Sequence, residues 1–188
     1  MVRNTGAVAA RSPLRLVSVN VGTPTILAQM CVENVWSGIR KRPVDATDIL
    51  WLSELNLSGD AQADLSVHGG ADKAVYAYPG EHYAFWRTVR SQAGLSLWDE
   101  PLAPGSIGEN LTLDGLVESQ VWIGDVLRFP QCALAVSEPR YPCFKLNAAM
   151  GFKHASKLMT QSGWCGFYLA VREPGTLAAG ESFTIVPG

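Results

Sequence analysis

Glycine and proline interrupt the apolar runs of this chain often, which favours many short strands over a few long helices. The 188 residues include 18 glycines and 11 prolines, and both residue types favour turns over the interior of regular elements. The runs between these breaks resemble short strands, and two stretches have near-helical spacing. The strand-like runs lie at 14–21, 49–52, 74–78, 107–113, 121–129, 132–137, 167–171 and 182–186, and the helix-like stretches at 81–94 and 146–161.

The order of these elements predicts the fold class. About nine or ten short strands with two helices indicate a mostly β protein with some α, in which a closed β-barrel is decorated by a few helices. A doubly wound sheet is excluded, because its helices would have to alternate with its strands. The length fits a single domain over residues 13–188, preceded by a flexible N-terminus of residues 1–12.

Composition and charge exclude several classes of function. The formal net charge is −2, so no overall basic field attracts nucleic acid or an anionic membrane, and any anion site must be local. No apolar run approaches transmembrane length, and the stretch 6–10 is too short for a signal peptide. The four cysteines form no CxxC pair, which favours a reducing cytoplasm as the location.

The turn around Cys143 carries the clearest sign of chemistry. Cys143 stands between a strand-like run and a helix-like stretch, and Pro139 and Pro142 stiffen the turn that holds it. Arg140 and Lys145 place positive charge on either side of the thiol, which favours the thiolate. A thiolate on a rigid turn can serve as a soft-metal ligand or a nucleophile. The alternative is a small buried apolar side chain, as most free cysteines are.

Two further motifs are candidates for binding. Arg40 and Lys41 belong to the one dense cation cluster of a mildly acidic chain, and they can grip a phosphate or form a solvated edge strand. His68 is followed by Gly69 and Gly70, which permit positive φ or a close backbone approach to a ligand. A hairpin corner is the alternative for these three residues. His82, in the first turn of the 81–94 helix, is expected to be solvated.

These motifs together resemble the MOSC domain, a fold shared with the C-terminal domain of molybdenum-cofactor sulfurases, and among its members those of the YiiM type. The resemblance runs from about residue 19 to residue 180, and its specificity lies in the order and spacing of the motifs. The segments that carry it are 37–41, 59–64, 67–74, 78–79, 108–111, 123–125 and 139–143.

The resemblance implies a β-barrel that binds a molybdopterin-type molybdenum cofactor, with Cys143 as the protein ligand to molybdenum. It places Arg40 and Lys41 at the cofactor's phosphate, and His68, Gly69, Asn110 and Arg140 around the cofactor mouth. Relatives of the YiiM type are associated with reduction of N-hydroxylated substrates such as hydroxylaminopurines, and the wider family also with pyridoxal phosphate binding.

Two functions from different classes follow from the resemblance. The first is the catalytic component of a reductase, which needs a separate electron-transfer protein because the chain has no cysteine cluster for an iron–sulfur centre. The second is a non-catalytic carrier of the cofactor, or of sulfur as a persulfide on Cys143. The oligomeric state stays open, with a homodimer among the options.

Overall fold

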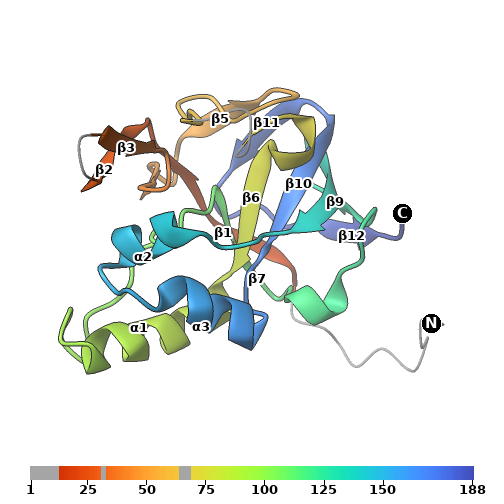
Figure 1. Cartoon of the computed structure of the whole chain (residues 1–188). Coiled ribbons are helices and arrows are strands. Elements are labelled where there is room, and N and C mark those ends of the chain that lie inside the picture. The colour runs from red at the N-terminus through yellow and green to blue at the C-terminus, as the bar shows by residue number, and fades with distance from the viewer. Residues whose placement is uncertain (1–12, 31–32, 64–68) are drawn as a thin grey trace.

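The computed structural model describes residues 13–30, 33–63 and 69–188, and short strands dominate it (Figure 1). The strands are β1 (Arg15–Val21), β2 (Thr25–Met30), β3 (Glu33–Ser37), β4 (Arg42–Pro43), β5 (Ile49–Leu52), β6 (Val75–Pro79), β7 (Leu111–Asp114), β8 (Val126–Arg128), β9 (Ala133–Pro139), β10 (Phe167–Glu173), β11 (Gly175–Ala178) and β12 (Thr184–Val186). The helices are α1 (Tyr83–Gln92), α2 (Phe144–Met150) and α3 (Ala155–Ser162), with 3-10 turns η1 (Ala71–Lys73), η2 (Gly80–His82) and η3 (Glu118–Gln120).

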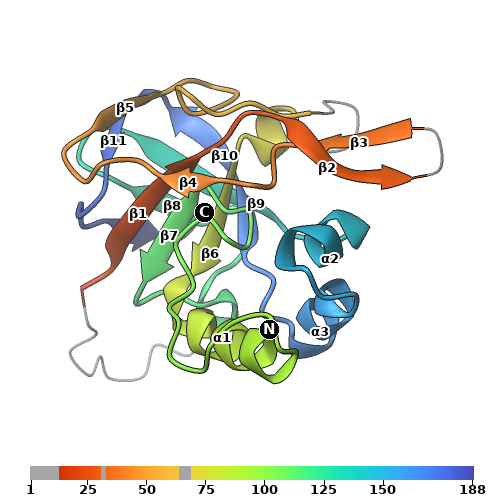
Figure 2. The ribbon, with the colours of Figure 1, turned by 90° about the vertical axis from the view of Figure 1, so that its left-hand side faces the viewer.

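Eight strands form one mixed sheet in the order β12-β8-β9-β10-β6-β7-β1-β4. The neighbours β6 and β7 run parallel, which requires the long crossover that α1 supplies between them. The pairs β11-β5 and β2-β3 form two separate small sheets. The β2–β3 hairpin extends away from the large sheet on the side of α2 (Figure 2).

The predicted closed barrel is wrong, because no sheet within the described residues closes on itself. The two end strands of the large sheet, β12 and β4, do not pair with each other. The strand β4 has only two residues, and Pro43 has no backbone N–H to donate to a further strand. The start of β1 meets the segment before β12 through an isolated bridge between Arg15 and Ser182. The fold is mostly β with a few helices, built on an open mixed sheet.

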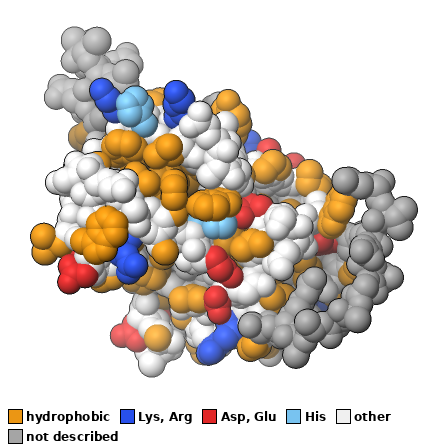
Figure 3. Space-filling model, turned by 90° about the horizontal axis from the view of Figure 1, so that it is seen from below, with side chains coloured by type: hydrophobic (Ala, Val, Ile, Leu, Met, Phe, Trp, Pro, Cys, Tyr) orange, Lys and Arg blue, Asp and Glu red, His pale blue; other side chains and the backbone are white. Residues whose placement is uncertain are grey.

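Two hydrophobic clusters stabilise this arrangement. The first joins the strands of the large sheet and includes Leu16, Leu111 and Leu134, all fully buried. The second, around Trp86 and Met159, seats the helices against β6, and the three helices lie together below the sheet in Figure 1. Seen from this helical side, hydrophobic side chains are spread over the surface among single charged ones (Figure 3).

The helix-like stretch 146–161 is interrupted, so the prediction of a single helix there is wrong. Gly151 ends α2 in the left-handed conformation, with φ 67°, a backbone state that glycine adopts at little cost. The chain then begins α3 at Ala155. None of the described helices has the length and apolar character needed to cross a membrane.

Candidate functional site

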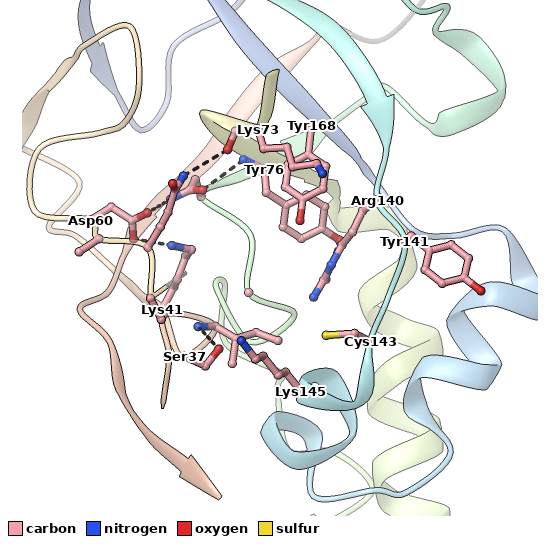
Figure 4. A pocket seen from close by; sticks show the side chains of 17 residues that line it. Ser37, Lys41, Asp60, Lys73, Tyr76, Arg140, Tyr141, Cys143, Lys145 and Tyr168 are labelled. Carbon is pink, nitrogen blue, oxygen red and sulfur yellow. Dashed lines mark hydrogen bonds and ion pairs between the residues drawn. The ribbon is translucent and has the colours of Figure 1, made fainter. Parts of the chain in front are cut away.

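A solvent-open pocket lies where segments far apart in the sequence meet (Figure 4). Its walls come from segment 37–41, which starts at the last residue of β3, segment 60–63 after β5, the tyrosines of β6 and β10, and segment 140–145, which runs from the end of β9 into α2. The pocket encloses about 710 Å³, including space open to solvent. Both the Cys143 turn and part of the cation cluster therefore face one cavity.

The turn that carries Cys143 joins β9 to α2, and its prolines predict that it is stiff. The strand β9 ends at Pro139, and the Arg140 backbone N–H donates to the Gly166 carbonyl over 3.3 Å. Pro142 is buried, and Cys143 precedes the first residue of α2 in an extended conformation. The cysteine is free and half-buried. Its sulfur is directed into the pocket, toward the same space as the Arg140 guanidinium (Figure 4).

Arg140 presents a buried positive charge to this space. The residue is 8% exposed, and its guanidinium carbon lies 4.5 Å from the centre of the Tyr76 ring. One guanidinium nitrogen, Nη1, donates to the Tyr76 hydroxyl over 3.0 Å and to the Ile107 carbonyl over 2.8 Å. No carboxylate pairs with Arg140 among the described residues. Since arginine stays protonated and burying an unpaired charge is costly, the site favours an anion.

Asp60 is the one carboxylate among the described residues that line the pocket. Its Oδ1 forms an ion pair with Lys41 Nζ and accepts a hydrogen bond from the Gly22 N–H over 2.8 Å. Its Oδ2 accepts from Asn110 Nδ2 over 3.0 Å. The side chains of Lys41 and Asp60 are 8% and 2% exposed. Burial lowers the pKa of Lys41, and the charge of Asp60 opposes this effect.

Asn110 links the pocket to the two parallel strands. Its backbone N–H donates to the Tyr76 carbonyl over 2.8 Å, and its Oδ1 accepts from the Tyr76 N–H over 3.1 Å. Its Nδ2 also lies 3.3 Å from the Asn20 carbonyl oxygen. With these contacts and the one to Asp60, the amide has a single orientation at the junction of β6 and β7.

Two glycines allow the pocket walls to approach each other closely. Gly108 has φ +91°, and a Cβ there would lie 2.6 Å from Ile39 Cγ1. A Cβ on Gly38 would lie 2.4 Å from the Ala61 carbonyl oxygen. Both distances are below van der Waals contact, so any larger residue would push apart the segments that hold Lys41 and Asp60.

The pocket is locally positive although the chain carries a net negative charge. Among the described residues, its lining includes four cations, which are Lys41, Lys73, Arg140 and Lys145, and one carboxylate, that of Asp60. Lys73 is also near Glu138, at 3.4 Å. Among the described residues, neither Arg140 nor Lys145 has an acidic partner. This arrangement agrees with the expectation that an anion site in this chain must be local.

The structure brings together four of the residues that the sequence analysis selected and separates others. Cys143, Lys41, Asn110 and Arg140 all line the pocket. Arg40 is exposed and is not part of the lining. Gly69 is half-buried and also lies outside the lining, and His68 lies outside the described residues. The roles assigned to these residues at a cofactor stay predictions.

Several lining residues were missed from the sequence. Asp60 and Lys73 lie in segments 59–64 and 67–74, which carry the family resemblance, but they were not selected as site residues, and neither were Tyr76 and Tyr168. Their partners are remote in the sequence, since Lys41 is 19 and Asn110 is 50 residues from Asp60.

His82 is not solvated as predicted. It is 7% exposed, its ring stacks on Trp164 with centroids 4.8 Å apart, and its Nε2 lies 2.8 Å from Glu118 Oε2. The other carboxylate oxygen of Glu118 accepts the Gly166 N–H over 2.8 Å. These contacts hold Gly166, just before β10, whose carbonyl accepts the backbone hydrogen bond of Arg140. His82 thus stabilises the pocket wall indirectly, through Glu118 and Gly166.

The donor atoms of the pocket limit the kind of metal site it can form. No group of three or more His, Cys, Asp or Glu side chains that could hold a metal ion occurs among the described residues. A metal would therefore have to arrive with most of its ligands supplied by a cofactor. A single soft thiolate beside unpaired cations suits a metal already held by sulfur on an anionic organic group.

Comparisons with known proteins agree on one family. A family model described as the MOSC domain matches residues 64–184. YflK of Bacillus subtilis is 40% identical over 171 residues, which cover 91% of this chain and 72% of YflK. YiiM of Escherichia coli is 42% identical over 151 residues, covering 80% of this chain and 64% of YiiM. A protein of Gibberella moniliformis named "Reductase" is 32% identical over 153 residues, covering 81% of this chain and 26% of that protein.

A solved structure extends the similarity to the fold. The crystal structure of YiiM from Geobacillus stearothermophilus superimposes with a TM-score of 0.69 and 32% sequence identity, covering 93% of this chain and 75% of that one. By sequence, the chain spans 64% of E. coli YiiM, less than two thirds, and 26% of the fungal protein, about a quarter.

Proposed function

The chain belongs to the MOSC domain family, and from this premise we propose that it binds a molybdenum cofactor in the pocket and serves as the catalytic component of a reductase. The proposed substrates are N-hydroxylated compounds, and the proposed electron source is a separate protein. The name of the fungal relative supports a reductase.

One observation carries this proposal. The thiol of Cys143 shares a cavity with Arg140 and Lys145, two cations without acidic partners in the described part of the chain. A thiolate binds soft, sulfur-ligated molybdenum, and the cations receive an anionic group of the same ligand. The donor set of the pocket thus fits the cofactor that MOSC domains are associated with.

Each residue has a distinct part in this proposal. Cys143 is the protein ligand to the metal, while Arg140 and Lys145 bind the anionic group. Asn110 and Tyr76 orient the ligand at the junction of β6 and β7. When bound, the cofactor supplies two-electron redox chemistry, and the protein's residues bind it, orient it and limit its access to water.

Metal analysis tests this function most simply. Protein purified from a host that makes the cofactor should contain molybdenum, and Cys143→Ser should lose it, because a hydroxyl is a harder and less acidic ligand. Cys165→Ser is the matched control, since Cys165 is also free and half-buried but does not line the pocket.

The outcomes separate the proposed function from its alternative. Equal molybdenum contents in the natural chain and Cys143→Ser would refute the ligand role. Sulfur bound to Cys143 without molybdenum would support the non-catalytic carrier instead. Mass spectrometry of the intact protein distinguishes these results.

A further inference from the structure

Lys41 is the pocket cation that forms a buried ion pair, whereas the pair of Lys73 with Glu138 is partly exposed. Its ammonium pairs with Asp60, and both side chains are almost fully buried. An ammonium held in this way has little residual charge to offer a ligand, whereas Arg140 and Lys145 keep theirs. The four lining cations are therefore not equivalent.

Asp60 also connects parts of the pocket wall that are distant in the sequence. Its carboxylate accepts from the N–H of Gly22 over 2.8 Å and from Asn110 Nδ2 over 3.0 Å. The next residue, Ala61, donates its N–H to the Gly22 carbonyl over 3.0 Å. The segment that carries Asp60 is thus tied to the turn after β1, and it cannot move away from Lys41 without breaking these bonds.

We propose that Asp60 is a positioning residue that neutralises Lys41 and holds it, together with Asn110, against the pocket wall, so that an anionic ligand is received by Arg140 and Lys145. This role deepens the proposed function and rests on it for the identity of the ligand. It also orients the ligand, because the neutral Lys41–Asp60 pair attracts anionic groups less than Arg140 and Lys145 do. The anionic part of the ligand then faces the Cys143 turn.

Inorganic phosphate is a suitable probe, because it reports the charge of the pocket without the cofactor. Its affinity for the full-length, cofactor-free chain can be measured by isothermal titration calorimetry. Asp60→Asn frees Lys41 and removes a negative charge, so phosphate should bind about tenfold more tightly, the lower end of what a charge-assisted hydrogen bond contributes. A merely structural defect would weaken binding, so the direction of the change is diagnostic. Unchanged or weaker binding by the folded variant would overturn the proposal.

A double variant keeps the test valid if Asp60→Asn does not fold. Lys41→Met combined with Asp60→Asn removes both charges of the buried pair, a change that proteins commonly tolerate. Phosphate affinity should then stay within about twofold of the natural chain, the usual error for independent sites. A loss of about tenfold would show that Lys41 itself binds the anion, since this is the minimum expected for a charged hydrogen bond.

Two other variants complete the experiment. Lys145→Met should weaken phosphate binding. Asp60→Glu keeps the charge, so its phosphate affinity should lie closer to that of the natural chain than the affinity of Asp60→Asn does. Glu173→Gln is the matched control, because it also removes one carboxylate from an ion pair, with Arg128, but at an exposed site outside the pocket. Its phosphate affinity should not change. Absence of phosphate binding in both the natural chain and Asp60→Asn would overturn the inference.

The phosphate experiment and the molybdenum analysis test the role of Asp60 and the proposed function separately. Protein that contains molybdenum through Cys143 but lacks the phosphate pattern would refute the role of Asp60 alone. The expected phosphate pattern in protein that never acquires molybdenum would refute the proposed cofactor and leave the role of Asp60 in place.

Discussion

The substitution Asp60→Ala should destabilise the chain strongly, because it leaves a buried ammonium without its partner. Lys41 is 8% exposed and Asp60 2% exposed in their side chains. Removing one member of a buried pair costs about 3–5 kcal/mol. Lys41 lines a solvent-open pocket and can regain some water, so we expect the lower end, about 3 kcal/mol.

The lost hydrogen bonds support this magnitude. Asp60 accepts from Gly22 and from Asn110, and a hydrogen bond to a charged group contributes about 1.5–3 kcal/mol. For a chain of 188 residues, a loss of about 3 kcal/mol lowers Tm by roughly 6–12 °C.

Urea unfolding followed by circular dichroism measures this effect. The midpoint should fall in Asp60→Ala while the slope stays constant. Glu173→Ala breaks an exposed pair with Arg128 and should cost no more than about 1 kcal/mol. A cost for Asp60→Ala as small as that of Glu173→Ala would refute the description of Asp60 as a buried anchor.

Three further predictions concern the glycine at the pocket wall, the Glu118 carboxylate behind it, and the source of electrons for the proposed reduction. Gly108→Ala should cost at least about 2 kcal/mol, because alanine is strained at φ +91° and its Cβ meets Ile39; a thermal melt unchanged from the natural chain would contradict this. Burial raises the pKa of Glu118, but hydrogen bonds from His82 and from the Gly166 N–H outweigh burial and leave that pKa below 4.5. A carboxyl with a lowered folded-state pKa stabilises the fold above its unfolded pKa, so the advantage of the natural chain over Glu118→Gln should be largest near neutral pH and shrink as pH falls through and below 4.5. An advantage independent of pH in urea unfolding would exclude this origin. Finally, the sequence contains no nucleotide-binding fingerprint and no iron–sulfur ligand set, so the cofactor-loaded chain should reduce a hydroxylamine with an artificial reductant but not with a nicotinamide donor alone; turnover with the nicotinamide would reveal a second redox site.

Local sequence signals predicted the elements around the pocket well. The prolines near Cys143 mark a rigid turn, and the structure ends β9 at Pro139 and begins α2 at Phe144. This signal is local because proline restricts its own φ and the conformation of the preceding residue. Gly151 breaks the following helix for an equally local reason, but a glycine in a helix-like stretch is often tolerated, so the sequence alone did not decide it.

Closure of the sheet could not be predicted in the same way. Whether β4 and β12 pair depends on strand lengths and on contacts between distant segments, and alternation in the sequence reports neither. The short β4 and its Pro43 leave that end of the sheet open.

The environments of the neighbouring cations Arg40 and Lys41 also depend on contacts that the sequence pattern does not report. Ile39 and Lys41 line the pocket while Arg40 is exposed, because the chain turns tightly at Arg40, where the Lys41 N–H donates to the Ile39 carbonyl over 3.1 Å. The dense charge run was compatible with an anion site or a solvated edge strand, and it could not show which of its members faces inward. Asp60 was missed because its partners come from other parts of the chain.

The central claim is that the Cys143 sulfur is the protein ligand to molybdenum, and X-ray absorption at the molybdenum edge tests it most directly. Protein loaded with the cofactor should show one more sulfur scatterer in the first coordination shell than the same cofactor free of protein, since Cys143→Ser is expected to retain no molybdenum. Cys165→Ser should give the spectrum of the natural chain. Identical sulfur shells in the loaded natural chain and in the free cofactor would contradict the account.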